Sequence, residues 1–147
     1  MTLLDLPGHL IRRLHQMSGH LFQQRVSEAG HDLTPVQFAT LRTLSTNPGL
    51  DQAQIAAITA CDRATIGGVI DRLEQKGYVM RTVSARDRRA REVSLTKTGL
   101  AIYEEILPVI YQLQDEILDG LSSGEREQFL ILVRKLVAKT LPEDAPA

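Results

Sequence analysis

The sequence predicts a mainly α-helical fold that contains one small β-hairpin. Apolar residues recur at the three- and four-residue spacing of helices along most of the chain. The period changes in YVMRTVS, residues 78–84, and in REVSLT, residues 91–96, which are rich in β-branched residues and flank a loop of arginines. Short helices joined by a tight turn and followed by a basic hairpin are typical of a winged helix-turn-helix, here with long helices at both ends.

Length and composition limit the classes of protein to consider. A chain of 147 residues suits one domain, with or without an appended oligomerisation element. Cys61 is the single cysteine, which excludes an internal disulfide and a cysteine zinc cluster. The absence of Trp argues against a platform for single-stranded nucleic acid. The N-terminal residues do not resemble a secretory signal and no apolar run could span a bilayer, so we expect a cytoplasmic protein.

The first helix is predicted to run from the N-terminus to about Ala29 and to stop at Gly30. Asp5 is the expected N-cap, with Pro7 in the first turn. An apolar stripe follows at helical spacing and comprises Leu6, Leu10, Leu14, Met17 and Leu21.

Three shorter helices are expected before the hairpin. TPVQ, residues 34–37, has the form of a capping box and opens a helix through Leu44, which the NPG of residues 47–49 ends. DQAQ, residues 51–54, opens a short third helix, and a fourth begins after Asp62 and ends at Gly77.

Two helices are expected after the hairpin. Residues 97–121 read as one long helix with a bend at Pro108. SSGE, residues 122–125, caps a last helix, and the tail at 142–147 is expected to be disordered. The last helix has an apolar face of Phe129, Leu132, Val133, Leu136 and Val137.

The fourth helix has one apolar and one small, polar face. Ile66, Val69, Ile70 and Leu73 form the inward stripe, and Ala64, Thr65, Gly68, Asp71, Arg72 and Gln75 form the other face. Gly67 and Gly68 each cost roughly 1 kcal/mol relative to alanine in a helix interior. Close approach to DNA or to a neighbouring helix would explain them, and a surface helix without such a role is the alternative.

The hairpin loop SARDRRARE, residues 84–92, holds four arginines although the chain has a formal net charge of -1 and a pI of about 6.4. Like charges repel, so the cluster does not stabilise the folded protein unless a polyanion or neighbouring carboxylates bind to it. A solvated charged loop is the alternative.

The segment from Gln54 to Gly99 resembles the core of the MarR family of bacterial transcriptional regulators. Three motifs carry the resemblance together, namely DRLEQKG, RDRR and LTKTG. The family's wing usually begins with Asp where this chain has Ser84, which puts a loop-bracing salt bridge in doubt.

The resemblance implies a symmetric homodimer on a palindromic operator in double-stranded DNA. Recognition helices would enter successive major grooves and wing tips the flanking minor grooves, where guanidinium groups suit the negative potential. Arg89 is expected either at the DNA or paired with Asp87, and Arg91 at a phosphate. The full set of expected DNA contacts is Arg63, Ala64, Thr65, Gly68, Arg72, Arg86, Arg88, Arg89 and Arg91.

The resemblance also divides the chain by role. Residues 1–30 and 97–141 would form dimerisation helices around a DNA-binding lobe at 31–96. The outer apolar stripes agree, because neither could face solvent in a stable monomer. A coiled tail for another partner is the alternative.

An effector site is expected beside the first helix, because similar proteins bind small aromatic carboxylates near their dimer helices. His9, Arg13, Gln16 and His20 lie along one border of its apolar face, where imidazole and guanidinium suit a carboxylate. Arg42 and Tyr111 could complete the site, and His15 ranks lower. The alternative is a polar rim of the dimer interface.

The predicted function is therefore a ligand-responsive repressor. No catalytic or metal-binding motif is present, so we expect neither an enzyme nor a cofactor. Cys61, in the turn before the fourth helix, is expected to be structural. A constitutive DNA-binding protein without an effector is the alternative function.

Overall fold

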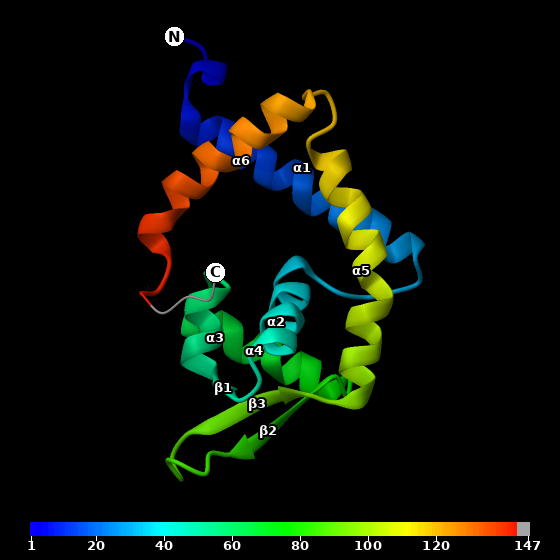
Figure 1. Ribbon diagram of the computed structural model, residues 1–147, viewed down its shortest axis with the longest axis vertical. Coiled ribbons are helices and arrows are strands. Elements are labelled where there is room, and N and C mark those ends of the chain that lie inside the picture. The colour runs from blue at the N-terminus through cyan, green and yellow to red at the C-terminus, as the bar shows by residue number, and fades with distance from the viewer. Residues whose placement is uncertain (144–147) are drawn as a thin grey trace. The chain divides into compact units, whose positions relative to one another are not determined.

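The computed structural model describes residues 1–143 and is mainly helical, as predicted (Figure 1). Its long elements follow the order expected from the hydrophobic periodicity. In chain order they are η1 (Leu3–Asp5), α1 (Pro7–Glu28), α2 (Pro35–Thr46), β1 (Leu50–Asp51), α3 (Gln52–Ile58), α4 (Arg63–Gln75), β2 (Val79–Val83), β3 (Arg91–Leu95), α5 (Lys97–Ile117), α6 (Ser123–Val137) and η2 (Ala138–Thr140). Residues 144–147 of the predicted disordered tail lie outside the described residues.

The predicted start of the first helix was wrong by one residue. Leu6, not Asp5, is the N-cap of α1, and Pro7 occupies the first turn. The Asp5 carboxylate instead accepts hydrogen bonds from the backbone N–H of Thr2 at 2.6 Å and from its hydroxyl at 3.0 Å. Asp5 therefore closes the short turn of η1, and those hydrogen bonds lower its pKa.

The sheet has one strand more than the predicted hairpin. Its order is β1–β3–β2, and both pairings are antiparallel. β2 and β3 form the expected hairpin, with Val79 opposite Leu95 and Val83 opposite Arg91. β1 was not predicted, because a strand of two residues has no readable period. Because β1 pairs with β3 and α3 begins at the next residue, this short strand positions the start of α3 beside β3.

Two further predicted helix ends were wrong by a few residues. α2 continues past Leu44 to Thr46, and α5 ends at Ile117 rather than at residue 121. α5 runs through Pro108 without interruption.

The chain folds into two compact units. One comprises Met1–Pro35 and Ile106–Gly120, and the other comprises Val36–Glu105 with the described residues from Leu121 onward. Fully buried side chains in the second unit include Leu41, Ile55, Ile66, Ile70 and Leu73. Burying each such side chain contributes roughly 1.5–3 kcal/mol, so this core fixes α2, α3 and α4. The division into dimerisation and DNA-binding segments by residue range remains a prediction.

The LTKTG segment fixes the start of α5 against the sheet. Thr96 accepts a hydrogen bond from the N–H of Gly99 at 3.0 Å and donates its own hydroxyl to the carbonyl of Gly77 at 2.6 Å. A side chain at Gly99 would collide with the backbone of Tyr78. The glycine is therefore required by close packing of α5 on the residue before β2.

Candidate nucleic-acid interface

A tight turn joins α3 to α4 and fixes the start of the fourth helix. Cys61 donates its backbone N–H to the carbonyl of Ala56 at 2.9 Å, which closes the end of α3. Ala60 adopts a φ of +56°, in the left-handed region that favours glycine. Together these features give the two helices the arrangement of a helix-turn-helix.

α4 begins after Asp62, as predicted, and Asp62 is its N-cap. Its carboxylate accepts hydrogen bonds from the backbone N–H of Thr65 at 2.7 Å and from the Thr65 hydroxyl at 2.9 Å. These bonds lower the pKa of Asp62, so the cap is charged at neutral pH. The Thr65 hydroxyl is thereby used in the cap, and the side chain keeps acceptor lone pairs and a methyl group for other contacts.

The predicted contact face of α4 is open to solvent. Every expected contact residue on the helix is exposed, namely Arg63, Ala64, Thr65, Gly68 and Arg72. The two neighbouring glycines have different surroundings. A Cβ at Gly67 would lie 3.1 Å from the Gln52 side chain of α3, whereas nothing lies within 4 Å of one at Gly68. Gly67 therefore allows α3 and α4 to pack closely. Gly68 leaves the outer face of α4 without a side chain at that position, so another molecule can approach the backbone there.

Ser84, at the position where the wing of MarR-like proteins usually has Asp, braces the hairpin loop through its hydroxyl. Its buried hydroxyl donates to Glu92 at 3.1 Å and accepts from the backbone N–H of Arg86 at 3.2 Å. Asp87 braces the tip by accepting the backbone N–H of Arg89 at 2.9 Å. The bracing bond at Asp87 thus uses the backbone of Arg89 rather than its guanidinium, which corrects the expected pairing. Arg86, Arg88, Arg89 and Arg91 are all exposed.

Arg81, which no sequence motif singled out, links the sheet to α3 and α4. Its guanidinium forms ion pairs with Asp71 at 2.7 Å and Glu74 at 3.2 Å, both on α4. A weaker hydrogen bond at 3.4 Å joins it to Gln52 of α3. Its side chain is only 19% exposed, so the ion pairs hold α4 against the hairpin.

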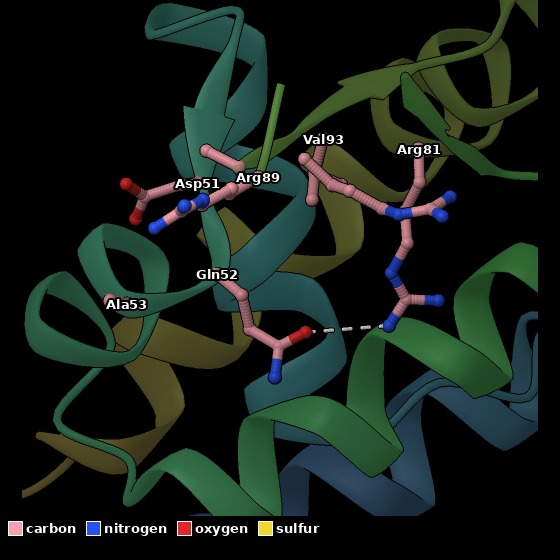
Figure 2. Close-up of a pocket in the computed structure, with 8 residues that line it drawn as sticks. Asp51, Gln52, Ala53, Arg81, Arg89 and Val93 are labelled. Atoms are coloured by element: carbon pink, nitrogen blue, oxygen red, sulfur yellow. Dashed lines mark hydrogen bonds between the residues drawn. The ribbon is translucent and has the colours of Figure 1, made fainter. Parts of the chain in front are cut away.

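Figure 2 shows this arginine at a cavity of about 410 Å³ beside the sheet, with its guanidinium directed toward Gln52. Arg89 and Arg91 line the same cavity, together with Asp51. The structure thus brings two expected DNA-contacting arginines to one basic surface at the base of the wing. A phosphate oxygen is the group that such a surface binds best.

Comparison with known proteins places this arrangement in a family. Residues 33–90, which contain the helix-turn-helix and most of the wing, match the model of the MarR family. The transcriptional repressor NicR of Pseudomonas putida is 35% identical over 130 residues, which are 88% of this chain and 81% of NicR. The chain belongs to the MarR family of transcriptional regulators.

Two solved structures extend this likeness beyond the family model. BpsR of Bordetella bronchiseptica, whose DNA binding is regulated by 6-hydroxynicotinic acid, is 32% identical with a TM-score of 0.87. The match covers 92% of this chain and 96% of BpsR. The repressor CouR, bound to a 23-mer DNA duplex, is 28% identical with a TM-score of 0.84, over 92% of this chain and 94% of CouR. The MarR fold therefore includes the outer helices of this chain.

Two of the residues expected to bind an effector, His20 and Arg42, line different cavities. His20 lines a cavity of about 260 Å³ with Leu14, Met17 and Glu116, all in the first compact unit. Arg42 lines another cavity, in the second unit. Arg13, Gln16 and Tyr111 are exposed, and His9 is half-buried. His15, which was ranked lower, lines a cavity of about 210 Å³ with Phe22 and Leu113. The assignment of the α1 residues to an effector remains a prediction.

Metal-binding clusters and membrane-spanning helices are other features that would bear on function. Residues 1–143 contain no group of three His, Cys, Asp or Glu side chains that could hold a metal ion. None of the helices described is long and apolar enough to cross a membrane. Cys61 is half-buried in the turn before α4.

Proposed function

We propose that the protein is a homodimeric repressor that binds a two-fold symmetric operator and leaves it when a small aromatic carboxylate binds. The observation that carries the proposal is the placement of exposed arginines on α4 and at the wing of a nearly neutral chain. A local cluster of cations attracts phosphates regardless of the net charge of the protein.

The two arginine groups suit different parts of a DNA duplex. Arg63 and Arg72 lie on the open face of α4, where guanidinium groups reach base edges and phosphates of a major groove. Arg86 and Arg88 are exposed at the tip of the hairpin, where guanidinium groups suit the negative potential of a minor groove. Arg89 and Arg91, at the base of the wing, are placed for the phosphate backbone.

Apolar side chains on the outer helices support a dimer. Exposed large apolar residues of the first segment comprise Leu3, Leu4, Leu6, Leu10, Ile11, Leu14 and Met17, and those of α6 comprise Leu130, Ile131, Leu132, Leu136 and Val137. Contiguous apolar surface on a soluble protein marks an interaction site. A second copy of the chain is the partner that a two-fold symmetric operator requires.

The effector class is inferred from the relatives. NicR is a repressor, and a hydroxylated pyridine carboxylate regulates the DNA binding of BpsR. We infer that a similar acid acts on this chain, and that the protein works where its DNA lies, in the cytoplasm. Its role is binding, and we propose no reaction for it.

Selection from randomised duplexes tests the DNA-binding part of the proposal. The purified full chain should enrich a two-fold symmetric site whose half-sites lie about 34 Å apart along the duplex. Titration of that complex with 6-hydroxynicotinate and 4-hydroxybenzoate should then release the DNA. An enriched site that no acid releases would favour the constitutive alternative, and enrichment of no sequence would contradict the repressor assignment.

A further inference from the structure

Arg81 of β2 contacts both α3 and α4, the recognition helix of the proposed function, but it is not among the residues expected to touch DNA. We propose that it is a positioning residue for DNA binding, which fixes the wing relative to α4 so that both can contact one half-site at the same time. This rests on the proposed function, because it concerns how the wing arginines reach the operator.

Both terminal nitrogens of the Arg81 guanidinium are paired with carboxylates of α4. Nη2 lies 2.7 Å from the Asp71 carboxylate, and Nη1 lies 3.2 Å from that of Glu74. The two carboxylates are three residues apart and therefore lie on one side of the helix. A planar guanidinium that holds both of them fixes the rotation of α4 about its axis as well as its position, which a compact point charge such as a lysine ammonium does not.

A third contact joins the same guanidinium to α3. Nη2 donates a hydrogen bond at 3.4 Å to Oε1 of Gln52, at the start of that helix (Figure 2). The Gln52 side chain also packs on α4, because its amide nitrogen lies 3.1 Å from where a Cβ at Gly67 would be. The two helices of the helix-turn-helix are thus linked to β2 through one side chain.

The strand that carries Arg81 is also part of the wing. Arg81 pairs with Val93 of β3, and Val83 pairs with Arg91. Because successive side chains of a strand point to opposite faces, Arg81, Arg91 and Val93 share one face, and all three line the cavity at the base of the wing. The ladder joins the two strands, so a shift of Arg81 relative to α4 would also move Arg91 and the loop that precedes it.

Arg81 is poorly placed to bind DNA itself. Its side chain is 19% exposed, and both of its terminal nitrogens already contact carboxylates. Its partners are more open, since the side chains of Asp71 and Glu74 are 63% and 45% exposed. Carboxylates on a recognition helix repel phosphates, so removal of two solvated carboxylates would strengthen DNA binding. The positioning role predicts the opposite change.

Neutralising the two carboxylates distinguishes these roles. Asp71→Asn/Glu74→Gln should weaken binding of the full chain to its selected operator by about tenfold, although two negative charges are lost. Fluorescence anisotropy measures the affinity. Glu104→Gln/Glu127→Gln, at exposed positions of α5 and α6, is the matched control and should bind at least as tightly as the parent. Unchanged or tighter binding by Asp71→Asn/Glu74→Gln would overturn the inference.

A double-mutant cycle tests whether Arg81 acts through the wing. Arg81→Met should weaken binding by about tenfold in the parent but by less than about twofold in Arg86→Ala/Arg88→Ala, whose wing contacts are already lost. Equal weakening in both backgrounds would show that Arg81 acts independently of the wing and would overturn the inference. Arg81→Lys keeps the charge without the planar group and should bind more like Arg81→Met than like the parent. Parental binding by Arg81→Lys would overturn the role given to the guanidinium.

Footprints on the selected duplex locate the contacts that are lost. Hydroxyl radicals attack the sugars along the minor groove and report the wing, whereas dimethyl sulfate methylates guanine N7 in the major groove and reports α4. Arg81→Met should lose the hydroxyl-radical protection beside each half-site and keep the N7 protection. Loss of both protections together would show a general destabilisation and overturn the inference. Thermal melting verifies that every variant is folded at the assay temperature.

The outcomes also separate the role of Arg81 from the proposed function. Selection of no operator would contradict the repressor assignment and the positioning role with it. An operator that the parent binds, with equal weakening by Arg81→Met in both backgrounds, would overturn the positioning role alone. Parental binding by Arg86→Ala/Arg88→Ala would contradict the proposed wing contacts and leave Arg81 no wing contact through which to act.

Discussion

At the scale of single residues, Ala60 shows how a helix-turn-helix is fixed by backbone conformation. Its φ of +56° follows the end of α3, where the N–H of Cys61 bonds to the carbonyl of Ala56. Glycine is the usual residue in this conformation, because a Cβ there meets the backbone at a cost of about 1–2 kcal/mol.

Ala60→Gly should therefore stabilise the protein by about 0.5 kcal/mol, since relief of the left-handed strain exceeds the entropy that glycine adds to the unfolded chain. Ala57→Gly, at an exposed position within α3, is the matched control and should destabilise by about 1 kcal/mol. Denaturant unfolding measures both changes. Equal destabilisation by the two substitutions would show that the turn does not strain Ala60.

A second residue-scale prediction concerns Glu116, which joins α5 to α1. Its carboxylate accepts hydrogen bonds from Arg25 Nε at 3.0 Å and from Arg25 Nη2 at 2.7 Å, and these bonds lower the pKa of Glu116. A carboxyl whose pKa is lowered by folding contributes stability that is complete above its ordinary pKa of about 4.3 and is lost as the pH falls through the lowered value.

Glu116→Gln should accordingly lower the free energy of unfolding at pH 7, and its difference from the parent should shrink as the pH falls below about 4.3. Urea unfolding at pH 7, 5, 4 and 3 measures the trend. Glu28→Gln is the control, because Glu28 is 57% exposed and also pairs with Arg25, so its removal should have a smaller effect. A constant difference at all four pH values would contradict the role given to Glu116.

At the scale of elements, α4 has one buried face and one outer face, and Gly68 leaves the outer face without a side chain at its position. Because nothing lies within 4 Å of a Cβ at this position, an alanine fits the isolated protein without strain. Its cost arises only when another molecule approaches the helix closely.

Gly68→Ala should stabilise the protein by about 1 kcal/mol and still weaken its binding to the selected operator by roughly tenfold. Thermal unfolding and fluorescence anisotropy with the labelled duplex measure the two effects. Gly67→Ala, beside Gln52, is the comparison within the same helix, and its effect should appear in stability. A Gly68→Ala protein that binds operator as tightly as the parent would remove Gly68 from the interface.

Sequence patterns predicted the elements better than the contacts between them. Caps such as Asp51 and Asp62 and the period of the apolar residues are local, so helix order and most boundaries were predicted correctly. The strand β1 has too few residues to show a period, and the pairing of Arg81 with Asp71 exists only after β2 packs on α4. The Arg42 cavity likewise depends on α2 meeting the end of α3, which no spacing in the sequence records.

At the scale of the whole molecule, the outer helices bear on assembly. The structure buries no residue of α6, and its Leu132 and Leu136 are 55% and 59% exposed. Such a helix is poorly stabilised alone, because burial of its apolar face contributes most of the stability of a helix.

Leu132→Glu should shift the monomer–dimer equilibrium toward the monomer by at least about tenfold, because an unpaired carboxylate in an apolar interface costs several kcal/mol. Sedimentation velocity at micromolar concentration measures the shift. Glu127→Gln, at an exposed polar position of the same helix, is the control and should sediment as the parent does. A parent that is monomeric at this concentration would contradict the homodimer.

The wing arginines are proposed to bind DNA phosphates or the minor groove between them. Arg86 and Arg88 are exposed at the tip of a loop that backbone hydrogen bonds to Ser84 and Asp87 hold in shape. Removing their side chains should therefore weaken the attraction to DNA without unfolding the wing. Arg12 and Arg134 are exposed on α1 and α6 and provide a control of equal charge.

The salt dependence of DNA binding tests the role of the wing. Fluorescence anisotropy with the selected duplex gives the affinity between 50 and 300 mM salt for the parent, for Arg86→Ala/Arg88→Ala and for Arg12→Ala/Arg134→Ala. Each arginine removed from a phosphate should flatten the log–log slope by about 0.9, so a dimer without four such arginines should flatten by up to about 3.6. We expect this flattening for the wing variant and the parental slope for the control. A wing variant with the slope and affinity of the parent would show that the wing does not bind DNA.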